Sequence, residues 1–197
     1  MDIYGKKAAM VTLGCKVNQY ETDAMREMLE EAGAVIVDAK EGPDIYIVNT
    51  CSVTNVAERK SRQMLHRAKR KNPNVVVVAV GCYAQVGKEE LEADQHIDLI
   101  IGNNKKKDLI RILQDFQPKG MPETEVLDIA ADRNFENLHV DHIETHTRAY
   151  IKVQDGCNQF CSYCIIPYAR GRVRSREKED VLEEIRNLAH GESVNSL

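Results

Sequence analysis

Short apolar runs alternate with amphipathic segments along the first 116 residues of the chain. Runs typical of strands occupy residues 8–14, 34–38, 44–50, 75–81 and 97–102. Segments with the spacing of amphipathic helices occupy residues 18–33, 54–71, 86–94 and 105–116. The run VVVVAVG at 75–81 is continuous and β-branched, as expected of a central parallel strand that is covered on both faces. This alternation predicts a doubly wound α/β domain over residues 1–116, flavodoxin- or Rossmann-like, with five parallel strands.

The hydrophobic pattern changes after residue 116. Residues 117–146 are polar and acidic and contain two prolines, so we expect a linker or wrapping loop there. A new strand is predicted at 148–156, RAYIKVQDG, and an amphipathic helix at 175–190. These elements predict that a second domain begins at residue 147 and continues to residue 197.

The composition is that of an ordinary globular protein, with 43% hydrophobic and 29% charged residues and a net charge of −4. No apolar run has transmembrane length and the first residues do not resemble a signal peptide, so we expect a cytoplasmic protein with no membrane partner. In that compartment the six cysteines indicate metal binding or catalysis and not a disulfide framework.

Three of the cysteines lie close together in the stretch GCNQFCSYCIIPYARG at 156–171. Cys157, Cys161 and Cys164 have the spacing C-x3-C-x2-C. A structural zinc site or a conventional iron–sulfur cluster takes four protein ligands. Three thiolates therefore suit a four-iron cluster in which one iron keeps an open position for a small molecule. Zinc is the competing metal, because Cys161 and Cys164 alone could form half of a zinc site.

The other three cysteines share a structural context although they are far apart in the sequence. Cys15, Cys51 and Cys82 follow the first, third and fourth predicted strands. In a sheet of order 2-1-3-4-5 these strands are neighbours, and the loops at their carboxyl ends meet at one edge. Because adjacent strands lie about 4.8 Å apart, three thiolates could surround one cluster there. The alternative interpretation is three separate buried thiols.

Two basic runs stand out against the acidic total charge. Their candidate contacts for a polyanion are Arg59, Lys60 and Arg62 in the run 58–71, and Arg170, Arg172, Arg174 and Arg176 in the run 169–178. A basic face on an acidic protein fits a polyanionic partner such as RNA, and it fits a solvated helix face equally well.

The spacing C-x3-C-x2-C with Tyr163 before its last cysteine resembles the signature of the radical S-adenosylmethionine (SAM) enzymes. The resemblance implies that Cys157, Cys161 and Cys164 hold a [4Fe–4S] cluster whose open iron binds SAM. It also implies that Tyr163 packs near the SAM adenine. In that family the cofactor supplies the radical chemistry, and the protein supplies position and exclusion of water.

Four blocks together resemble the methylthiotransferase family of radical SAM enzymes: LGCKVNQYET, NTCSVTNVAERKSRQ, GCYAQ and GCNQFCSYCIIPYARGRVRSR. The resemblance implies a second, auxiliary [4Fe–4S] cluster held by Cys15, Cys51 and Cys82, with SAM, an electron donor and a sulfur source as further partners. The CKVNQYET and KSRQ blocks look most like the branch that modifies N6-threonylcarbamoyladenosine at position 37 of tRNA.

Three other functions stay open at this point. The isopentenyladenosine and ribosomal-protein aspartate branches of the family use the same chemistry, and a non-catalytic iron–sulfur or zinc module that contacts RNA is the alternative of a different class. The resemblance also implies that only the first strand–helix unit of a partial TIM barrel is present before residue 197. We therefore expect this chain alone to be inactive, because most of a closed radical pocket would be missing.

Overall fold

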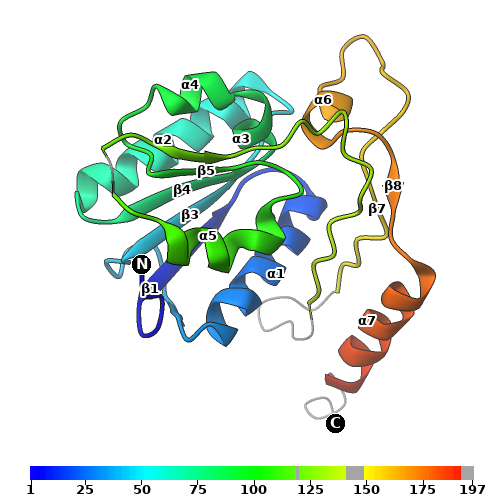
Figure 1. Cartoon of the computed structure of the whole chain (residues 1–197), viewed down its shortest axis with the longest axis horizontal. Coiled ribbons are helices and arrows are strands. Elements are labelled where there is room, and N and C mark those ends of the chain that lie inside the picture. Colours follow the sequence, from blue (N-terminus) through cyan, green and yellow to red (C-terminus); the bar gives the residue numbers. More distant parts are fainter. Residues whose placement is uncertain (119, 141–148, 192–197) are drawn as a thin grey trace.

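The first part of the chain forms one parallel sheet, as the sequence predicts. The computed structural model describes residues 1–118, 120–140 and 149–191. In these residues a sheet with the order β2-β1-β3-β4-β5-β6 forms, and every neighbouring pair of its strands is parallel (Figure 1). The strands are β1 (Lys7–Thr12), β2 (Val35–Ile36), β3 (Ile45–Thr50), β4 (Val76–Gly81), β5 (Leu99–Ile101) and β6 (Glu123–Glu125).

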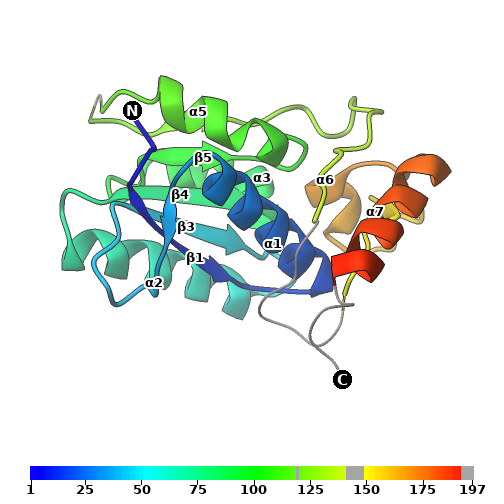
Figure 2. The same ribbon diagram turned by 90° about the horizontal axis from the view of Figure 1, so that it is seen from below.

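Helices cover both faces of this sheet. One face carries α1 (Lys16–Glu31) and α5 (Leu109–Asp115), which follows the 3-10 turn η1 (Lys106–Asp108). The other face carries α2 (Asn55–Lys71), α3 (Cys82–Val86) and α4 (Lys88–Glu92). Figure 2 shows the two helical layers on either side of the strands. The doubly wound α/β fold is therefore confirmed.

The central strands are apolar at successive positions because each face of the sheet has its own core. In β4, Val78 and Val80 point to the core under α1 and α5, whereas Val77 and Ala79 point to the core under α2. Side chains alternate between the faces of a strand, so a strand covered twice has no polar face to present. All four of these side chains are fully buried.

The segment that was expected to be a linker contributes a sixth strand. β6 lies in this segment and pairs with β5, with Leu99 opposite Glu123. The backbone groups along an unpaired edge of β5 would otherwise need other partners, and a short polar strand supplies them. Further along, Leu138 and Val140 are buried against Tyr20 and Ala24 of α1, so this part does wrap the domain. Residues 141–146 of the segment lie outside the described residues.

The second region differs from the sequence prediction at its strand. Of the predicted strand 148–156 only β7 (Gln154–Asp155) forms a ladder, antiparallel to β8 (Arg174–Ser175), and residue 148 lies outside the described residues. A strand needs a partner, and the nearest one in this chain is the segment that returns after α6 (Ile166–Arg170).

The last helix of the second region is present, and part of its apolar face is open. α7 (Lys178–Gly191) forms as predicted, with Leu182 and Ile185 exposed and Leu188 buried. Within the described residues no helix is long and apolar enough to cross a membrane.

Gly81 connects β4 to α3 in a conformation that only glycine adopts without strain. Its φ is +94°, and a Cβ atom there would lie 2.4 Å from Asn49 Oδ1 and 2.9 Å from the Thr50 carbonyl oxygen. The sharp turn sends the chain into Cys82 at the carboxyl edge of the sheet. We expect Gly81→Ala to lower the free energy of unfolding by more than about 3 kcal/mol, because backbone strain and a steric clash add.

Gly42→Ala is the matched control for this prediction. Gly42 also has a positive φ, +68°, but no atom lies within 4 Å of a Cβ built there. Gly42→Ala should lower the free energy of unfolding only by the backbone strain, about 1–2 kcal/mol. Urea denaturation of the metal-free proteins measures both values, and equal losses for the two variants would contradict the steric argument.

Candidate metal centres

The first, third and fourth strands along the chain lie side by side, as required for the proposed shared site. β1, β3 and β4 are neighbours in the sheet, and their carboxyl ends lie at the same edge. Cys15 is the residue before α1, Cys51 follows β3 directly, and Cys82 begins α3. Ligands bind at this edge in open α/β sheets. The strand order on which the sequence argument depends is therefore confirmed.

Asn18 ties the first two cysteine loops together. Its Nδ2 donates to the carbonyl oxygens of Leu13, at 3.0 Å, and Thr50, at 2.9 Å, the residues two before Cys15 and one before Cys51. Its Oδ1 lies 3.4 Å from the Cys15 Sγ. The close approach of the loops also leaves no room for a side chain at Gly14, where a Cβ would lie 3.0 Å from the Cys51 Sγ.

Sequence reasoning missed Asn18. The signal was present, because Asn18 is a polar residue on the face of the helix that must be buried, in the block CKVNQYET. A buried amide needs partners for its donors and acceptor, and backbone carbonyls of neighbouring loops are the usual ones. Asn18 thereby fixes the spacing of the two loops.

Cys82 lies deeper than Cys15. Cys51 and Cys82 are buried, while Cys15 is exposed. Asn103 Nδ2 approaches the Cys82 Sγ at 3.8 Å. Burial raises the pKa of the Cys82 thiol above its usual value, and the nearby Arg170 guanidinium offsets only part of this effect. A bound metal would replace the thiol proton, because metal ligands must be deprotonated.

The spacing of the thiols bears on which metal each cysteine set could hold. Tetrahedral zinc with Zn–S bonds of about 2.3 Å brings thiolate sulfurs to about 3.8 Å from one another. Among the described residues, ligand atoms within 4.8 Å of one another belong to His66, Asp94 and His96, and to neither cysteine set. Three thiols, the number in each set, would match a [4Fe–4S] cluster with one open iron.

The group His66, Asp94 and His96 is a separate structural feature. It lies next to α2 and the turn before β5, at the amino ends of the strands, opposite the cysteines. His66 Nε2 and His96 Nδ1 each hydrogen-bond to one carboxylate oxygen of Asp94. Burial alone would raise the pKa of Asp94, but the hydrogen bonds from both histidines lower it overall. These groups satisfy one another without an ion.

The loop with the second cysteine set is ordered by aromatic packing. Cys157 N donates to the Gly171 carbonyl oxygen at 3.0 Å, which closes the loop. Phe160 has a φ of +47°, packs edge-on against Tyr168 with ring centroids 5.8 Å apart, and lies under the Arg172 guanidinium at 4.3 Å. Cys157 and the other two thiols remain accessible, with Cys161 the most exposed. Sequence reasoning missed Phe160 and this stacking.

Tyr163 extends into solvent with 91% of its surface exposed. No described residue packs over its ring, so its predicted role beside the SAM adenine stays a prediction. An aromatic side chain that projects this far from the protein has little structural function of its own.

In the run 169–178, three of the four arginines predicted to contact RNA are buried, which corrects the prediction for these three. Arg170, Arg174 and Arg176 have exposed fractions of 4%, 3% and 6%. Arg170 pairs with two carboxylates, Arg174 donates to the Arg170 carbonyl oxygen, and Arg176 forms a buried ion pair with Glu184. A guanidinium buried in this way cannot reach a phosphate at the protein surface. Only Arg172 is exposed.

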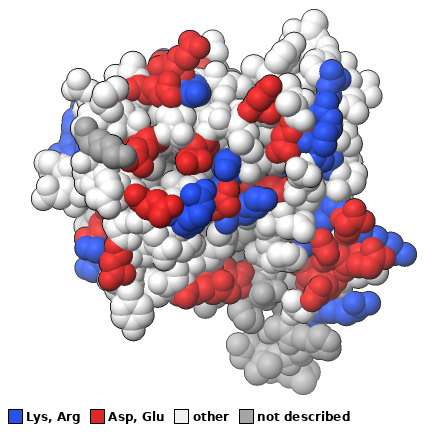
Figure 3. Space-filling view, in the orientation of Figure 1, with Lys and Arg blue, Asp and Glu red and all other residues white. Residues whose placement is uncertain are grey.

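The basic helix α2 keeps an exposed basic surface. Arg59 and Lys60 are exposed. Arg62 is half-buried and donates to the Tyr83 hydroxyl at 2.6 Å and to Glu90 at 2.8 Å, so it is committed to the fold. Figure 3 views the opposite side of the sheet, where acidic and basic side chains are interspersed over α1 and α5. Any polyanion contact in the first domain is therefore expected on α2.

Two families of known proteins match separate parts of the chain. Residues 7–102 match the uncharacterized protein family UPF0004, and residues 151–197 match the Radical SAM superfamily. The first match contains Cys15, Cys51 and Cys82, and the second contains the other three cysteines.

Individual relatives match nearly the whole chain. It is 39% identical over 183 residues to the threonylcarbamoyladenosine tRNA methylthiotransferase MtaB of Aquifex aeolicus, and 41% identical over 180 residues to MtaB of Bacillus subtilis. It is 38% identical over 189 residues to the tRNA-2-methylthio-N(6)-dimethylallyladenosine synthase of Carboxydothermus hydrogenoformans. These matches cover 93%, 91% and 93% of the chain but 45%, 40% and 42% of the relatives. The chain thus spans less than half the length of these relatives.

We expect the two cysteine sets to bind iron independently. Cys51→Ala should remove roughly half of the iron bound after anaerobic reconstitution, because two thiolates hold a cluster poorly, and it should spare the SAM-sensitive signal in the electron paramagnetic resonance spectrum. Cys161→Ala should remove the other half together with that signal. Iron and sulfide analysis measures the first effect. Loss of all iron from either single variant, in a protein whose circular dichroism is unchanged, would contradict two separate sites.

Proposed function

We propose that this chain, which belongs to the radical SAM methylthiotransferases, is the cluster-bearing part of an enzyme that places a methylthio group on C2 of N6-threonylcarbamoyladenosine 37 in tRNA. The convergence of Cys15, Cys51 and Cys82 at one sheet edge, beside a segment with the C-x3-C-x2-C spacing, carries the proposal. The names of its relatives support a tRNA substrate.

The residues of the chain divide between two cofactor sites. Cys157, Cys161 and Cys164 would hold the cluster that binds SAM, with Tyr163 available to cover the bound adenine. Cys15, Cys51 and Cys82 would hold the auxiliary cluster. When bound, these groups supply the methyl donor, the radical and the sulfur. The protein orients them and keeps water from the reacting carbon.

The burial pattern of the cysteines suits this division of roles. A buried thiol such as Cys82 keeps an auxiliary cluster shielded on the protein side. The exposed Cys161 and Tyr163 leave the other cluster open on the side from which SAM and a nucleoside must enter. An electron donor and a sulfur source are further partners that this chemistry requires.

The threonylcarbamoyladenosine branch is favoured over the dimethylallyladenosine branch by the relatives. MtaB proteins match this chain at up to 41% identity. The dimethylallyladenosine synthase of Carboxydothermus hydrogenoformans matches it at 38%, and that branch is therefore the second candidate. Both branches would act on an adenosine of an anticodon loop, where an unstacked base can enter a buried site.

Nucleoside mass spectrometry of tRNA tests the substrate. In a strain that lacks the gene, 2-methylthio-N6-threonylcarbamoyladenosine should be absent, and the complete coding sequence that contains this chain should restore it. The same sequence with Cys51→Ala should not restore it. If the level of this nucleoside is unchanged in the deletion strain while 2-methylthio-N6-isopentenyladenosine disappears, the second candidate is the function.

The exposed start of α2 should contribute to tRNA affinity. Replacing Arg59 and Lys60 together by Glu should weaken tRNA binding roughly 10-fold or more at 0.1 M salt, since phosphate contacts dominate such affinity, and should make the salt dependence less steep. Lys6→Glu with Lys7→Glu is the matched control, because these lysines lie at the amino end of β1, opposite the cysteines. Filter binding at several salt concentrations measures both. Equal losses for the two double variants would contradict a specific contribution of α2.

A further inference from the structure

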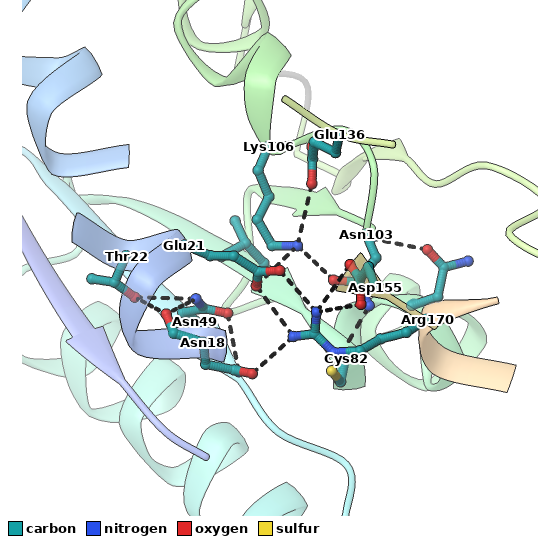
Figure 4. Close-up of polar contacts among 12 residues, drawn as sticks. Asn18, Glu21, Thr22, Asn49, Cys82, Asn103, Lys106, Glu136, Asp155 and Arg170 are labelled. Atoms are coloured by element: carbon teal, nitrogen blue, oxygen red, sulfur yellow. Dashed lines mark hydrogen bonds and ion pairs between the residues drawn. The ribbon is translucent and has the colours of Figure 1, made fainter. Parts of the chain in front are cut away.

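Charged side chains are buried between the first domain and the second cysteine loop (Figure 4). Glu21 of α1 lies at the centre with no exposed surface. Lys152 donates to its Oε1 at 2.8 Å, and Lys106 lies 3.3 Å from its Oε2. Burial alone would raise the pKa of Glu21, but Arg170, Lys106 and Lys152 hold it well below its usual value. Glu21 is therefore charged in the folded protein.

Arg170 makes the contacts that join Glu21 to the second region. Its Nη1 donates to Glu21 Oε1 at 2.8 Å and to Asp155 Oδ1 at 3.0 Å. Its Nη2 donates to Glu21 Oε2 at 3.2 Å and to Asn18 Oδ1 at 3.0 Å. A planar guanidinium can bridge two carboxylates and an amide in this way, whereas a single ammonium group cannot reproduce the geometry.

These contacts attach both ends of the second cysteine loop to α1. Asp155 lies two residues before Cys157, and Arg170 lies six residues after Cys164. The backbone hydrogen bond from Cys157 N to the Gly171 carbonyl oxygen closes the same loop next to Arg170. The loop from Asp155 to Arg170 is thus attached to Glu21 near its first and its last residue.

The same contacts extend to the thiols at the sheet edge. Asn18, which accepts from Arg170, lies 3.4 Å from the Cys15 Sγ through the same oxygen. On the other side, Lys106 donates to Asn103 Oδ1 at 2.5 Å, and Asn103 Nδ2 lies 3.8 Å from the Cys82 Sγ and 2.6 Å from the Ala169 carbonyl oxygen. A continuous set of polar contacts therefore runs from the thiols of Cys15 and Cys82 to Asp155 and Arg170, which flank the second cysteine loop.

We infer that Arg170, held by Glu21 and Asp155, is a positioning residue that fixes the second cysteine loop relative to Cys15 and Cys82. The inference rests on the proposed function, since it assigns these residues to the alignment of two cluster sites. Buried ion pairs contribute little net stability, and breaking one leaves an uncompensated charge. What such contacts supply is a fixed geometry. Misplacement of reacting groups by about 1 Å can lower the rate of a reaction about 100-fold.

The test compares Arg170→Lys with Arg111→Lys in the protein reconstituted with iron and sulfide. Arg111 is the matched control because it also pairs with a carboxylate, Asp115 at 3.3 Å, but at the exposed surface of α5. We expect both variants to bind the wild-type amount of iron. In Arg170→Lys the magnetic coupling between the two reduced clusters, measured by electron paramagnetic resonance, should change, whereas in Arg111→Lys it should match the wild type.

A second measurement follows the coupling of the two half-reactions in the complete enzyme. Arg170→Lys should still form 5′-deoxyadenosine from SAM, but the methylthiolated nucleoside formed per 5′-deoxyadenosine should fall about 10-fold or more. If both the magnetic coupling and this ratio equal those of Arg111→Lys, the positioning role is wrong. The magnetic measurement requires no tRNA, so a wild-type enzyme that binds two clusters and makes no such nucleoside contradicts the proposed function alone.

A double variant keeps the test decisive if Arg170→Lys does not fold. Glu21→Gln with Arg170→Gln removes one buried charge of each sign and leaves amides that can still hydrogen-bond, while Lys152 stays paired with Asp155 and Lys106 with Glu136, so folding should be retained. We expect it to bind both clusters and to show the same altered magnetic coupling. Wild-type coupling in this folded double variant would overturn the inference.

Discussion

Glu21 is a carboxylate without contact to solvent, and the arrangement around both cysteine sets depends on how its charge is balanced. Three cations reach it, from η1, from the segment before β7 and from α6. Loss of any one of them would leave the buried charges around Glu21 less well balanced, which is unfavourable in the protein interior. The second region is thereby bound to α1 through a polar contact with directional geometry, and not only through apolar packing.

The parallel sheet supplies the other half of the site. Parallel strands end at one edge, so residues that follow β1, β3 and β4 meet there however far apart they are in the sequence. Two residues set the positions of the cysteine loops at this edge. Gly81 forms the turn before Cys82, which no other residue fits, and Asn18 joins the loops of Cys15 and Cys51 by hydrogen bonds. Of the three thiols, those of Cys51 and Cys82 are buried and that of Cys15 is exposed.

The arginines after the second cysteine set form one sequence pattern, but some are in buried ion pairs and one is exposed. Arginines at every second position indicate a surface for a polyanion. However, Arg170 is paired with Glu21 of α1, far away in the sequence, and Arg176 is paired with Glu184 of the following helix α7. The exposed Arg172 between them stacks on Phe160. The count of basic residues in a run therefore overstates the charge that is available to a partner, because pairing removes the buried members.

The order of strands and helices in the first domain and the grouping of the cysteines were predicted from the sequence, because periodicity and cysteine spacing can be recognised without knowledge of the fold. Asn18 as a bridge between loops, β6 as an added edge strand and Glu21 as the partner of Arg170 were decided only by the tertiary structure. Each depends on a specific pair of distant residues or strands, and neither periodicity nor the general rule that parallel strands end at one edge identifies such a pair.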